Sequence, residues 1–189
     1  MSPEVSMEIQ AVLNSDIAMQ FDECTPYEIK GQPTSEKTAR ASLEMSLRWG
    51  DRSLKRFREL NTGNGLFGIV QGGRSEKLRR QSAEIIGAMD FDGFGIGGSF
   101  EKEDMEKAVE WVNNILPKEK PRHLLGIGDP ADLFGAIENG IDTFDCMVPT
   151  HYARRGIAFV SGRKLDLNKS VFLKDKKPLD SKCGCPVCQ

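Results

Sequence analysis

The sequence has 189 residues, of which 39% are hydrophobic and 29% charged, and its formal net charge at pH 7 is −2. These values are ordinary for a soluble globular protein, and the small net charge argues against a general polyanion binder. No apolar run approaches the roughly 20 residues that a membrane-spanning helix needs, and no signal peptide is recognisable. We therefore expect a cytoplasmic protein with no membrane partner.

Short apolar runs alternate with amphipathic helical stretches along the first 146 residues. Ser2-Pro3-Glu4 is typical of a helix start, because it combines a capping hydroxyl, a first-turn proline and an acidic residue. We expect helices over residues 3–13, 36–60, 75–89, 104–116 and 130–139. We expect strands over residues 16–22, 66–71, 91–96, 123–127 and 141–146. This alternation predicts parallel βα units, as in a doubly wound open sheet or a TIM barrel.

Polar residues and glycines gather at the carboxyl ends of these strands. A TIM barrel places its catalytic and binding groups there, whereas no glycine-rich phosphate loop supports a nucleotide-binding open sheet. We therefore predict an α/β fold in which residues 1–149 form part of a TIM (β/α)8 barrel. Five units do not close an eight-stranded barrel, so we expect the first strands to lie upstream of this sequence. The strand-end residues are Asp22, Gln71, Gly97, Gly98, Gly126 and Asp145.

The strand-end residues suit recognition of a heterocyclic base. Gln71 donates and accepts hydrogen bonds, Asp22 accepts them, and Gly97 and Gly98 let a flat ligand approach the backbone. Asp145 has the chemistry of a nucleophile or a general acid–base, since a carboxylate can attack the anomeric carbon of a sugar. The alternative is that each aspartate is a helix cap or a loop anchor.

The last forty residues have a different texture. Residues 156–160 and 164–167 flank Ser161-Gly162 and predict a small β-hairpin. Cys183, Cys185 and Cys188 then fall within the last seven residues, a grouping typical of zinc ligands rather than of a disulfide framework. We expect residues 150–189 to form a zinc-binding subdomain whose fourth ligand lies beyond this sequence. A fortuitous cysteine-rich tail is the alternative.

Several short motifs follow one another along the sequence. They are Ser2-Pro3-Glu4, Phe21-Asp22-Glu23-Cys24-Thr25-Pro26-Tyr27, Gly68-Ile69-Val70-Gln71-Gly72, Gly97-Gly98, Gly126-Ile127-Gly128-Asp129-Pro130, Phe144-Asp145-Cys146-Met147-Val148-Pro149-Thr150 and the three terminal cysteines. In this order they resemble the bacterial-type tRNA-guanine transglycosylases along essentially the whole sequence. That resemblance implies a TIM barrel with a structural zinc, in a cytoplasmic and generally homodimeric protein. It implies a pentosyltransferase that exchanges guanine at the wobble position of GUN-anticodon tRNAs for a 7-deazaguanine, a step toward queuosine.

The resemblance also implies roles for individual residues, with Asp145 as the nucleophile that attacks C1′ of the ribose. The implied base-binding residues are Asp22, Cys24, Gln71, Gly97, Gly98, Ser99, Leu125 and Gly126. The implied RNA-binding residues are Gly126, Ile127, Gly128, Asp129, Pro130, Ala131 and Asp132, together with Thr150, His151, Tyr152, Ala153 and Arg154. The implied zinc ligands are Cys183, Cys185 and Cys188, completed by a downstream histidine.

The sequence departs from the family pattern at two places. His151 replaces an arginine that helps to read the anticodon. Ser99-Phe100 replaces a small apolar pair, which leaves open whether the incoming base is preQ1 or queuine.

The family's general-base aspartate lies upstream of Ser2, so we expect the 189-residue chain alone to be inactive. Alternatives are a non-catalytic tRNA-binding partner subunit and a base exchanger with another nucleic-acid target. His123, on a strand, is expected to be a core histidine.

Overall fold

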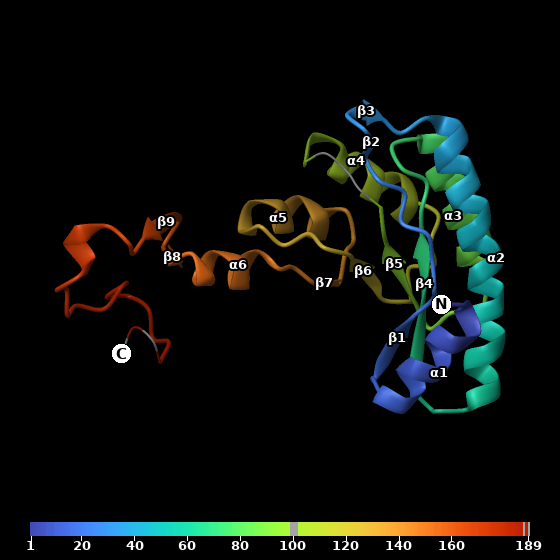
Figure 1. The fold of residues 1–189 in the computed structure, drawn as a ribbon, viewed down its shortest axis with the longest axis horizontal. Helices are drawn as coiled ribbons and strands as arrows, with labels where there is room; N and C mark the ends of the chain where they lie inside the picture. Colours follow the sequence, from blue (N-terminus) through green and yellow to red (C-terminus); the bar gives the residue numbers. More distant parts are fainter. Residues whose placement is uncertain (99–101, 187, 189) are drawn as a thin grey trace. The chain divides into compact units, whose positions relative to one another are not determined.

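A computed structural model describes residues 1–98, 102–186 and 188 of the chain. The chain divides into two compact units, Met1–Asp145 and Cys146–Gln189 (Figure 1). The first unit contains a five-stranded sheet with its helices, and the second contains a two-stranded hairpin and the cysteine-rich end. No helix within the described residues is long and apolar enough to cross a membrane.

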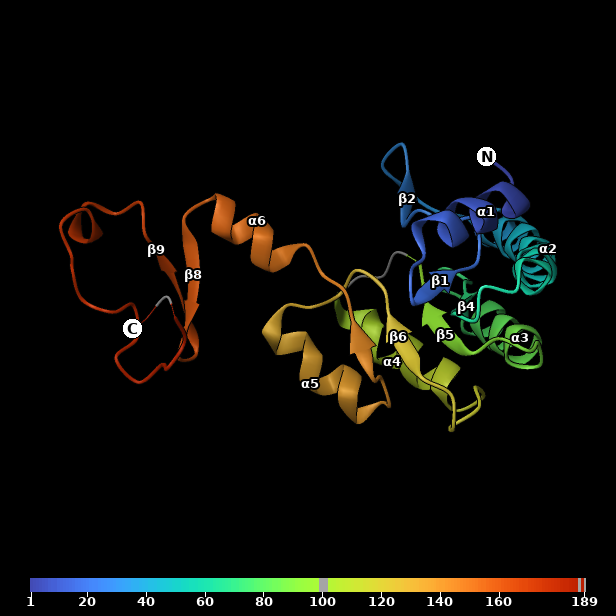
Figure 2. The same cartoon turned by 90° about the horizontal axis from the view of Figure 1, so that it is seen from below.

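The sheet of the first unit is parallel, and each strand joins the same side of the one before it. The order is β1-β4-β5-β6-β7, without the reversal that defines a doubly wound sheet. Because right-handed crossovers then place their helices on one side, the sheet curls and its helices follow outside it (Figure 2). The prediction of a partial TIM barrel is confirmed. The strands are Ile17–Met19 (β1), Gly65–Val70 (β4), Gly93–Ile96 (β5), Arg122–Leu124 (β6) and Thr143–Phe144 (β7).

The helices of the first unit begin at side-chain caps. The hydroxyl oxygens of Ser2, Ser35 and Ser75 accept hydrogen bonds from the first turn of their helices, and the Asp129 carboxylate does the same. The five predicted helices are confirmed, with ends shifted by up to three residues. They are Pro3–Leu13 (α1), Glu36–Leu60 (α2), Glu76–Gly87 (α3), Lys102–Asn113 (α4) and Pro130–Glu138 (α5).

The two faces of the sheet have different contents, because side chains alternate along each strand. The outer face carries apolar side chains that pack with the helices into one core. On β5 the opposite, inner face carries only glycine, at Gly93 and Gly95, and Gly97 continues this face directly after the strand. A Cβ at Gly93 would lie 2.5 Å from the Phe67 ring, and one at Gly97 would lie 2.8 Å from Gln71 Nε2. Side chains of β4 therefore lean across the bare surface of β5.

Strand β1 is shorter than predicted, and a hairpin follows it that the sequence did not indicate. The Phe21 and Glu23 backbone N–H groups bond to the hydroxyls of Ser53 and Ser46 on α2, not to β4. That exchange of partners ends the strand. The chain then forms β2 (Glu28–Ile29) and β3 (Gln32–Pro33), which are joined through Gly31 at a φ of 75°.

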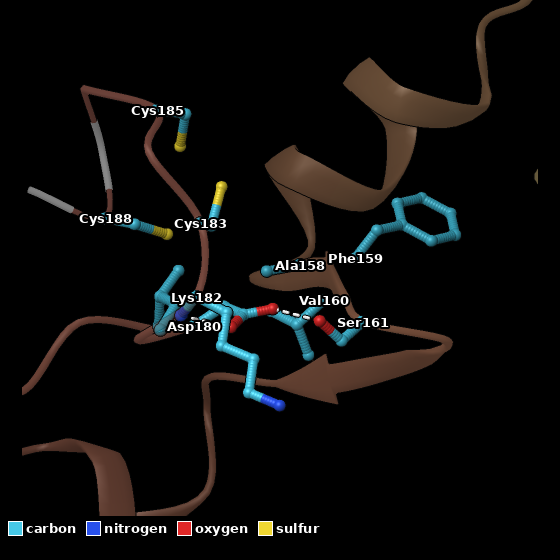
Figure 3. A pocket seen from close by; sticks show the side chains of 10 residues that line it. Ala158, Phe159, Val160, Ser161, Asp180, Lys182, Cys183, Cys185 and Cys188 are labelled. Carbon is cyan, nitrogen blue, oxygen red and sulfur yellow. Dashed lines mark hydrogen bonds between the residues drawn. The ribbon is translucent and has the colours of Figure 1, made fainter.

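The second unit contains the predicted hairpin, β8 (Ile157–Val160) paired with β9 (Arg163–Asp166). A helix that the sequence did not indicate, α6 (Val148–Arg154), precedes it, and a short 3-10 turn, Ser170–Phe172 (η1), follows it. Figure 3 shows the end of the hairpin facing the cysteine-bearing segment. The Ser161 hydroxyl donates a hydrogen bond to the Asp180 carboxylate, which ties that segment to the hairpin.

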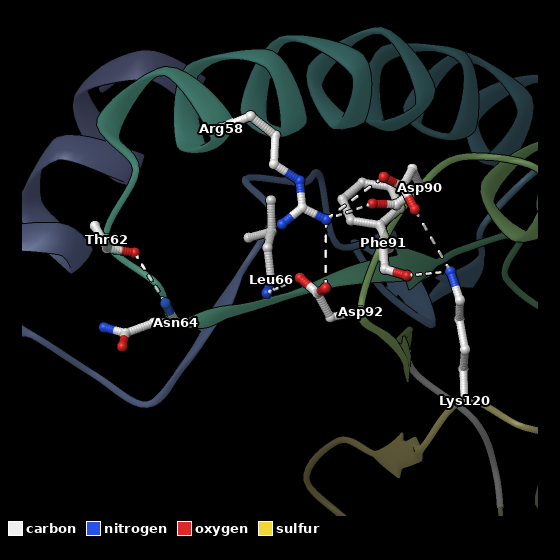
Figure 4. A network of polar contacts seen from close by, with 8 residues as sticks. All are labelled: Arg58, Thr62, Asn64, Leu66, Asp90, Phe91, Asp92 and Lys120. Atoms are coloured by element: carbon white, nitrogen blue, oxygen red, sulfur yellow. Dashed lines mark hydrogen bonds and ion pairs between the residues drawn. The ribbon is translucent and has the colours of Figure 1, made fainter.

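A charged network lies at the amino ends of the strands of the first unit (Figure 4). Asp92 Oδ2 accepts a hydrogen bond of 2.8 Å from the Leu66 N–H, and Asp92 Oδ1 lies 3.3 Å from Arg58 Nη2. Lys120 Nζ donates to the Phe91 carbonyl at 2.5 Å and lies 4.0 Å from Asp90 Oδ1. Positive and negative groups at this rim are thus paired with each other and with the backbone.

Candidate active site

The carboxyl ends of β1 and β4 bring Asp22 and Gln71 together. Gln71 Nε2 donates a 2.6 Å hydrogen bond to Asp22 Oδ2, and the Gln71 backbone N–H donates to Ser82 Oγ. Gln71 is buried, and its Oε1 atom has no hydrogen-bond partner within the described part of the chain. A buried acceptor without a donor is costly, so this oxygen is a ready binding point for an N–H group of a ligand.

Burial raises the pKa of Asp22. The hydrogen bond from Gln71 opposes this shift, and the neighbouring charge of Glu23 adds to it. The Asp22 carboxyl therefore holds its proton more readily than a solvated aspartate. Such a group can accept hydrogen bonds when ionised and donate one when protonated.

Arg79 on α3 supports the two glycines that follow β5. Its Nη1 donates to the Gly97 carbonyl at 2.9 Å, and its Nε donates to the Gly73 carbonyl at 2.8 Å. The side chain is fully buried, and burial lowers its pKa to about 9, so it stays charged at neutral pH. A Cβ at Gly98, where φ is 100°, would lie 2.7 Å from Arg79 Nη2. Glycine at this position is what allows the guanidinium to lie directly beneath the backbone.

Cys24 lies close to Asp22, Gly98 and Arg79. Burial raises the pKa of its thiol, the charge of Asp22 raises it further, and a backbone hydrogen bond from Gly98 opposes both. A thiol that stays protonated at neutral pH is a poor nucleophile. Cys24 is therefore suited to shape the pocket wall rather than to react.

Asp145 follows β7 and contacts two groups at the end of β6. Its Oδ1 lies 3.0 Å from His123 Nε2 and accepts a 2.9 Å hydrogen bond from the Gly126 N–H. His123 Nδ1 lies 2.9 Å from Thr143 Oγ1. His123 was expected to be a core histidine; its side chain is only 13% exposed, but it lies on the inner face of the sheet and bonds to Asp145.

The predicted base-binding residues thus form two groups along one edge of the sheet. Asp22, Cys24, Gln71, Gly97 and Gly98 form the first, and Asp145 with Gly126 forms the second. Leu125 lies between them, since its Cδ1 would be 3.3 Å from a Cβ at Gly95. Ser99 and Phe100 lie outside the described residues.

The predicted RNA-binding residues belong to both units. In the first unit, residues 126–132 form the turn after β6 and the first turn of α5, where Asp129 is the cap. In the second unit, residues 150–154 lie on α6. Tyr152 stacks edge-on against Phe159 at 5.4 Å between ring centroids, and Lys164 Nζ lies 4.6 Å from the centre of the Tyr152 ring. These side chains give the second unit a surface of aromatic and basic groups.

The three terminal cysteines lie together (Figure 3). The Sγ atoms of Cys183, Cys185 and Cys188 are all within 4.8 Å of one another. Tetrahedral coordination with Zn–S bonds of about 2.3 Å needs sulfurs about 3.8 Å apart. The cysteines also line a cavity of about 440 Å³ beside the hairpin. This cluster fits a metal ion.

Arg79 and His123 are the residues of the site that the sequence analysis missed. On α3, the buried residues Ser82, Ala83 and Ile86 follow Arg79 at helical spacing, which marks Arg79 as facing the sheet. On β6, His123 is two residues before Leu125 and therefore shares its face. Both periodicities can be found in the sequence.

Comparison with known proteins gives one consistent result. A family model described as "Queuine tRNA-ribosyltransferase" matches residues 1–189. Relatives of that name from Herminiimonas arsenicoxydans and Methylibium petroleiphilum are 48% and 47% identical to the chain. Each match covers the whole of this chain and 51% of the relative. One from Paracidovorax citrulli is 48% identical over 49% of its length. The chain spans about half the length of the curated relatives it matches.

Proposed function

The chain belongs to the queuine tRNA-ribosyltransferase family, and on this premise we propose that it supplies the nucleophile and part of the base pocket of a tRNA-guanine transglycosylase. The proposed enzyme exchanges guanine at the wobble position of GUN-anticodon tRNAs for a 7-deazaguanine. The observation that carries the proposal is the Asp145 carboxylate, held by one oxygen on the same rim as the Asp22–Gln71 pair.

Base recognition is assigned to Asp22, Gln71 and the backbone of Gly97 and Gly98. Gln71 Oε1, which has no partner among the described residues, and the Asp22 carboxyl offer acceptors to the N–H groups of a guanine-like edge. The bare glycines give a flat ring room to lie against the backbone. A base must leave its stack to reach such a pocket, so the wobble nucleotide is expected to be flipped out.

The proposed reaction proceeds by two displacements at the ribose. A carboxylate oxygen of Asp145 attacks C1′ while the C1′–N9 bond breaks. The electron pair of that bond leaves with guanine, which takes up a proton. The incoming 7-deazaguanine loses its proton, attacks C1′ through the equivalent ring nitrogen and releases the carboxylate. Two inversions give overall retention, as in retaining glycosidases.

The RNA contacts are assigned to residues 126–132 and 150–154. Arg154 and Arg155 are exposed and suited to phosphates, whereas Tyr152 is suited to stacking. Ser99 stays a proposed base-binding residue on the family resemblance alone, because it lies outside the described residues. Assaying preQ1 and queuine side by side as incoming bases identifies the natural one.

Zinc is the metal proposed for Cys183, Cys185 and Cys188, because three thiolates favour it over harder ions. Its role would be structural, holding the cysteine segment against the β8–β9 hairpin. Metal analysis of the natural-length protein should find about one zinc per chain, and Cys185→Ser should lose it and lower the melting temperature. Full zinc retention in that variant would contradict the assignment.

The central test is Asp145→Asn in the natural-length protein. Incubation with unmodified tRNA and radiolabelled guanine should give a denaturation-resistant protein–RNA adduct in the wild type. The variant should lose the adduct and slow exchange by roughly a thousandfold or more, with tRNA affinity retained. An adduct formed at the wild-type rate by the variant would exclude Asp145 as the nucleophile. A wild-type protein that binds tRNA but never forms an adduct would instead be a binding subunit.

A further inference from the structure

Resting on the proposed role of Asp145 as nucleophile, we propose that His123 is a positioning residue. It holds one oxygen of the Asp145 carboxylate and thereby presents the other oxygen to the ribose. His123 itself is not expected to touch the substrate.

The hydrogen bonds define a directed chain. An ionised carboxylate only accepts hydrogen bonds, so His123 Nε2 must be the donor in its 3.0 Å contact with Asp145 Oδ1. In the neutral imidazole the other nitrogen is then an acceptor, and Thr143 Oγ1 donates to it at 2.9 Å. The carboxylate therefore sets the tautomer, and the Thr143 hydroxyl, which can donate to Nδ1, holds the ring in the orientation that Asp145 requires. The same relation between a carboxylate, an imidazole and an orienting group recurs in nucleophilic enzymes.

The register of the sheet explains why these groups meet. His123 on β6 is paired with Thr143 on β7, and Asp145 is two residues beyond Thr143 on the same face. The imidazole thus lies along the inner face of the sheet and reaches Asp145 diagonally. Its side chain is 13% exposed, whereas that of Asp145 is 61% exposed. The mostly buried His123 ring therefore holds the exposed Asp145 carboxylate in place.

The two oxygens of Asp145 consequently differ. Oδ1 accepts hydrogen bonds from both His123 and the Gly126 N–H, whereas no described residue donates to Oδ2. The lone pairs of Oδ2 are therefore not engaged by a described donor and are available to attack C1′. In the ester, Oδ1 becomes the carbonyl oxygen and can keep both donors. When the incoming base displaces the carboxylate, these donors stabilise the returning negative charge. His123 is expected to assist both displacements.

The test uses His123→Phe and His123→Gln in the natural-length protein. Phenylalanine keeps the ring volume without either nitrogen, whereas the glutamine amide restores an N–H donor near the position of Nε2. At saturating tRNA, the Phe variant should form the covalent adduct roughly tenfold to a hundredfold more slowly. Chasing preformed adduct with the incoming base should also release it more slowly. The Gln variant should recover most of both rates, and tRNA affinity should change less than about twofold in either variant.

Two further variants complete the experiment. Thr143→Val removes the hydroxyl that orients the ring and should slow adduct formation by a smaller factor, roughly twofold to tenfold. Asp90→Ala, at the opposite rim, should leave the rate unchanged. Adduct formation at the wild-type rate in the Phe variant overturns the proposal, as does equal slowing by Phe and Gln. If the Phe variant no longer binds tRNA, a wild-type rate in Thr143→Val overturns it. Persistence of the adduct in Asp145→Asn refutes the nucleophile instead, which separates the two proposals.

Discussion

Charged side chains are paired differently at the two ends of the same sheet. At the amino ends, Arg58 is paired with Asp92, which also accepts from the backbone of β4 (Figure 4). At the carboxyl ends, neither Asp22 nor Asp145 is within salt-bridge distance of a lysine or arginine among the described residues. The buried cation there, Arg79, bonds to two carbonyl groups. One rim therefore satisfies its own polar groups, whereas the other keeps several available for a ligand.

This contrast fits the division of labour in TIM barrels, where the amino-terminal face stabilises and the carboxyl-terminal face reacts. It also carries an energetic consequence. Raising the pKa of Asp22 and burying Arg79 both work against folding, since charged groups lose hydration there. Substitutions at the amino-end rim should thus change stability without changing activity, whereas those at the carboxyl-end rim should change both.

Arg79→Met should have the largest effect on stability. It removes the N–H groups that donate to the Gly73 and Gly97 carbonyls, which costs about 2–4 kcal/mol of unfolding free energy. Base affinity should fall as well, because Gly97 loses its support. Arg80→Met is the matched control, since the Arg80 side chain is 41% exposed and pairs only with Glu76, at 2.7 Å, among described residues. Its cost should be below about 0.5 kcal/mol. Urea unfolding measures both, and equal costs would contradict a supporting role for Arg79.

Asp92→Ala should destabilise the protein by about 1–2 kcal/mol without changing the exchange rate per folded molecule. The cause is the Leu66 N–H, which loses its acceptor at the start of β4. Asp90→Ala is the control, since that side chain is 89% exposed and its ion pairs are long, at 3.8 and 4.0 Å. It should change stability by less than about 0.5 kcal/mol. A fall in exchange rate in folded Asp92→Ala would break the separation between the rims.

Asp22→Asn should give the smallest change in stability, and in the opposite direction. The raised pKa means that the folded state binds this proton more tightly than the unfolded chain does. Stability from Asp22 is therefore full below the unfolded pKa and is lost as pH rises through the folded pKa. Asparagine has no proton to lose, so the variant should melt higher than wild type at neutral pH, with the difference vanishing below about pH 4.

The same substitution should weaken base binding by roughly tenfold or more, because a buried partner of the base is altered. Thermal melts between pH 4 and 8, together with base titration, check both results. A melting difference that is independent of pH would show that burial of the Asp22 charge is not its cause.

The helices and the central strands were predictable because their determinants are local. Ser2, Ser35, Ser75 and Asp129 each cap a helix within the next three residues. Apolar runs bounded by glycine marked the central strands. The end of β1 was not predictable, since it depends on Ser46 and Ser53, which lie more than twenty residues away on α2. Helix α6 was missed because its seven residues carry too little apolar periodicity to stand out.

The candidate site was predictable as a set of strand-end residues, but its internal pairing was not. The Asp22–Gln71 hydrogen bond joins residues 49 positions apart in the sequence. The His123–Asp145 contact depends on the β6–β7 register, which the sequence alone leaves undefined. Side chains that meet across strands are fixed by tertiary structure, and only their shared face follows from alternation.

The bare inner face of β5 also limits how this pocket can evolve. A methyl group at Gly93 collides with an aromatic ring, one at Gly97 collides with the amide of Gln71, and one at Gly95 presses on Leu125. Of the three positions, Gly93 tolerates a side chain least, because the neighbouring Phe67 ring is itself buried. A side chain at Gly97 would displace the Gln71 amide and with it the hydrogen bond to Asp22. A larger residue in this strand should therefore be accommodated only together with a change at Gln71 or Leu125.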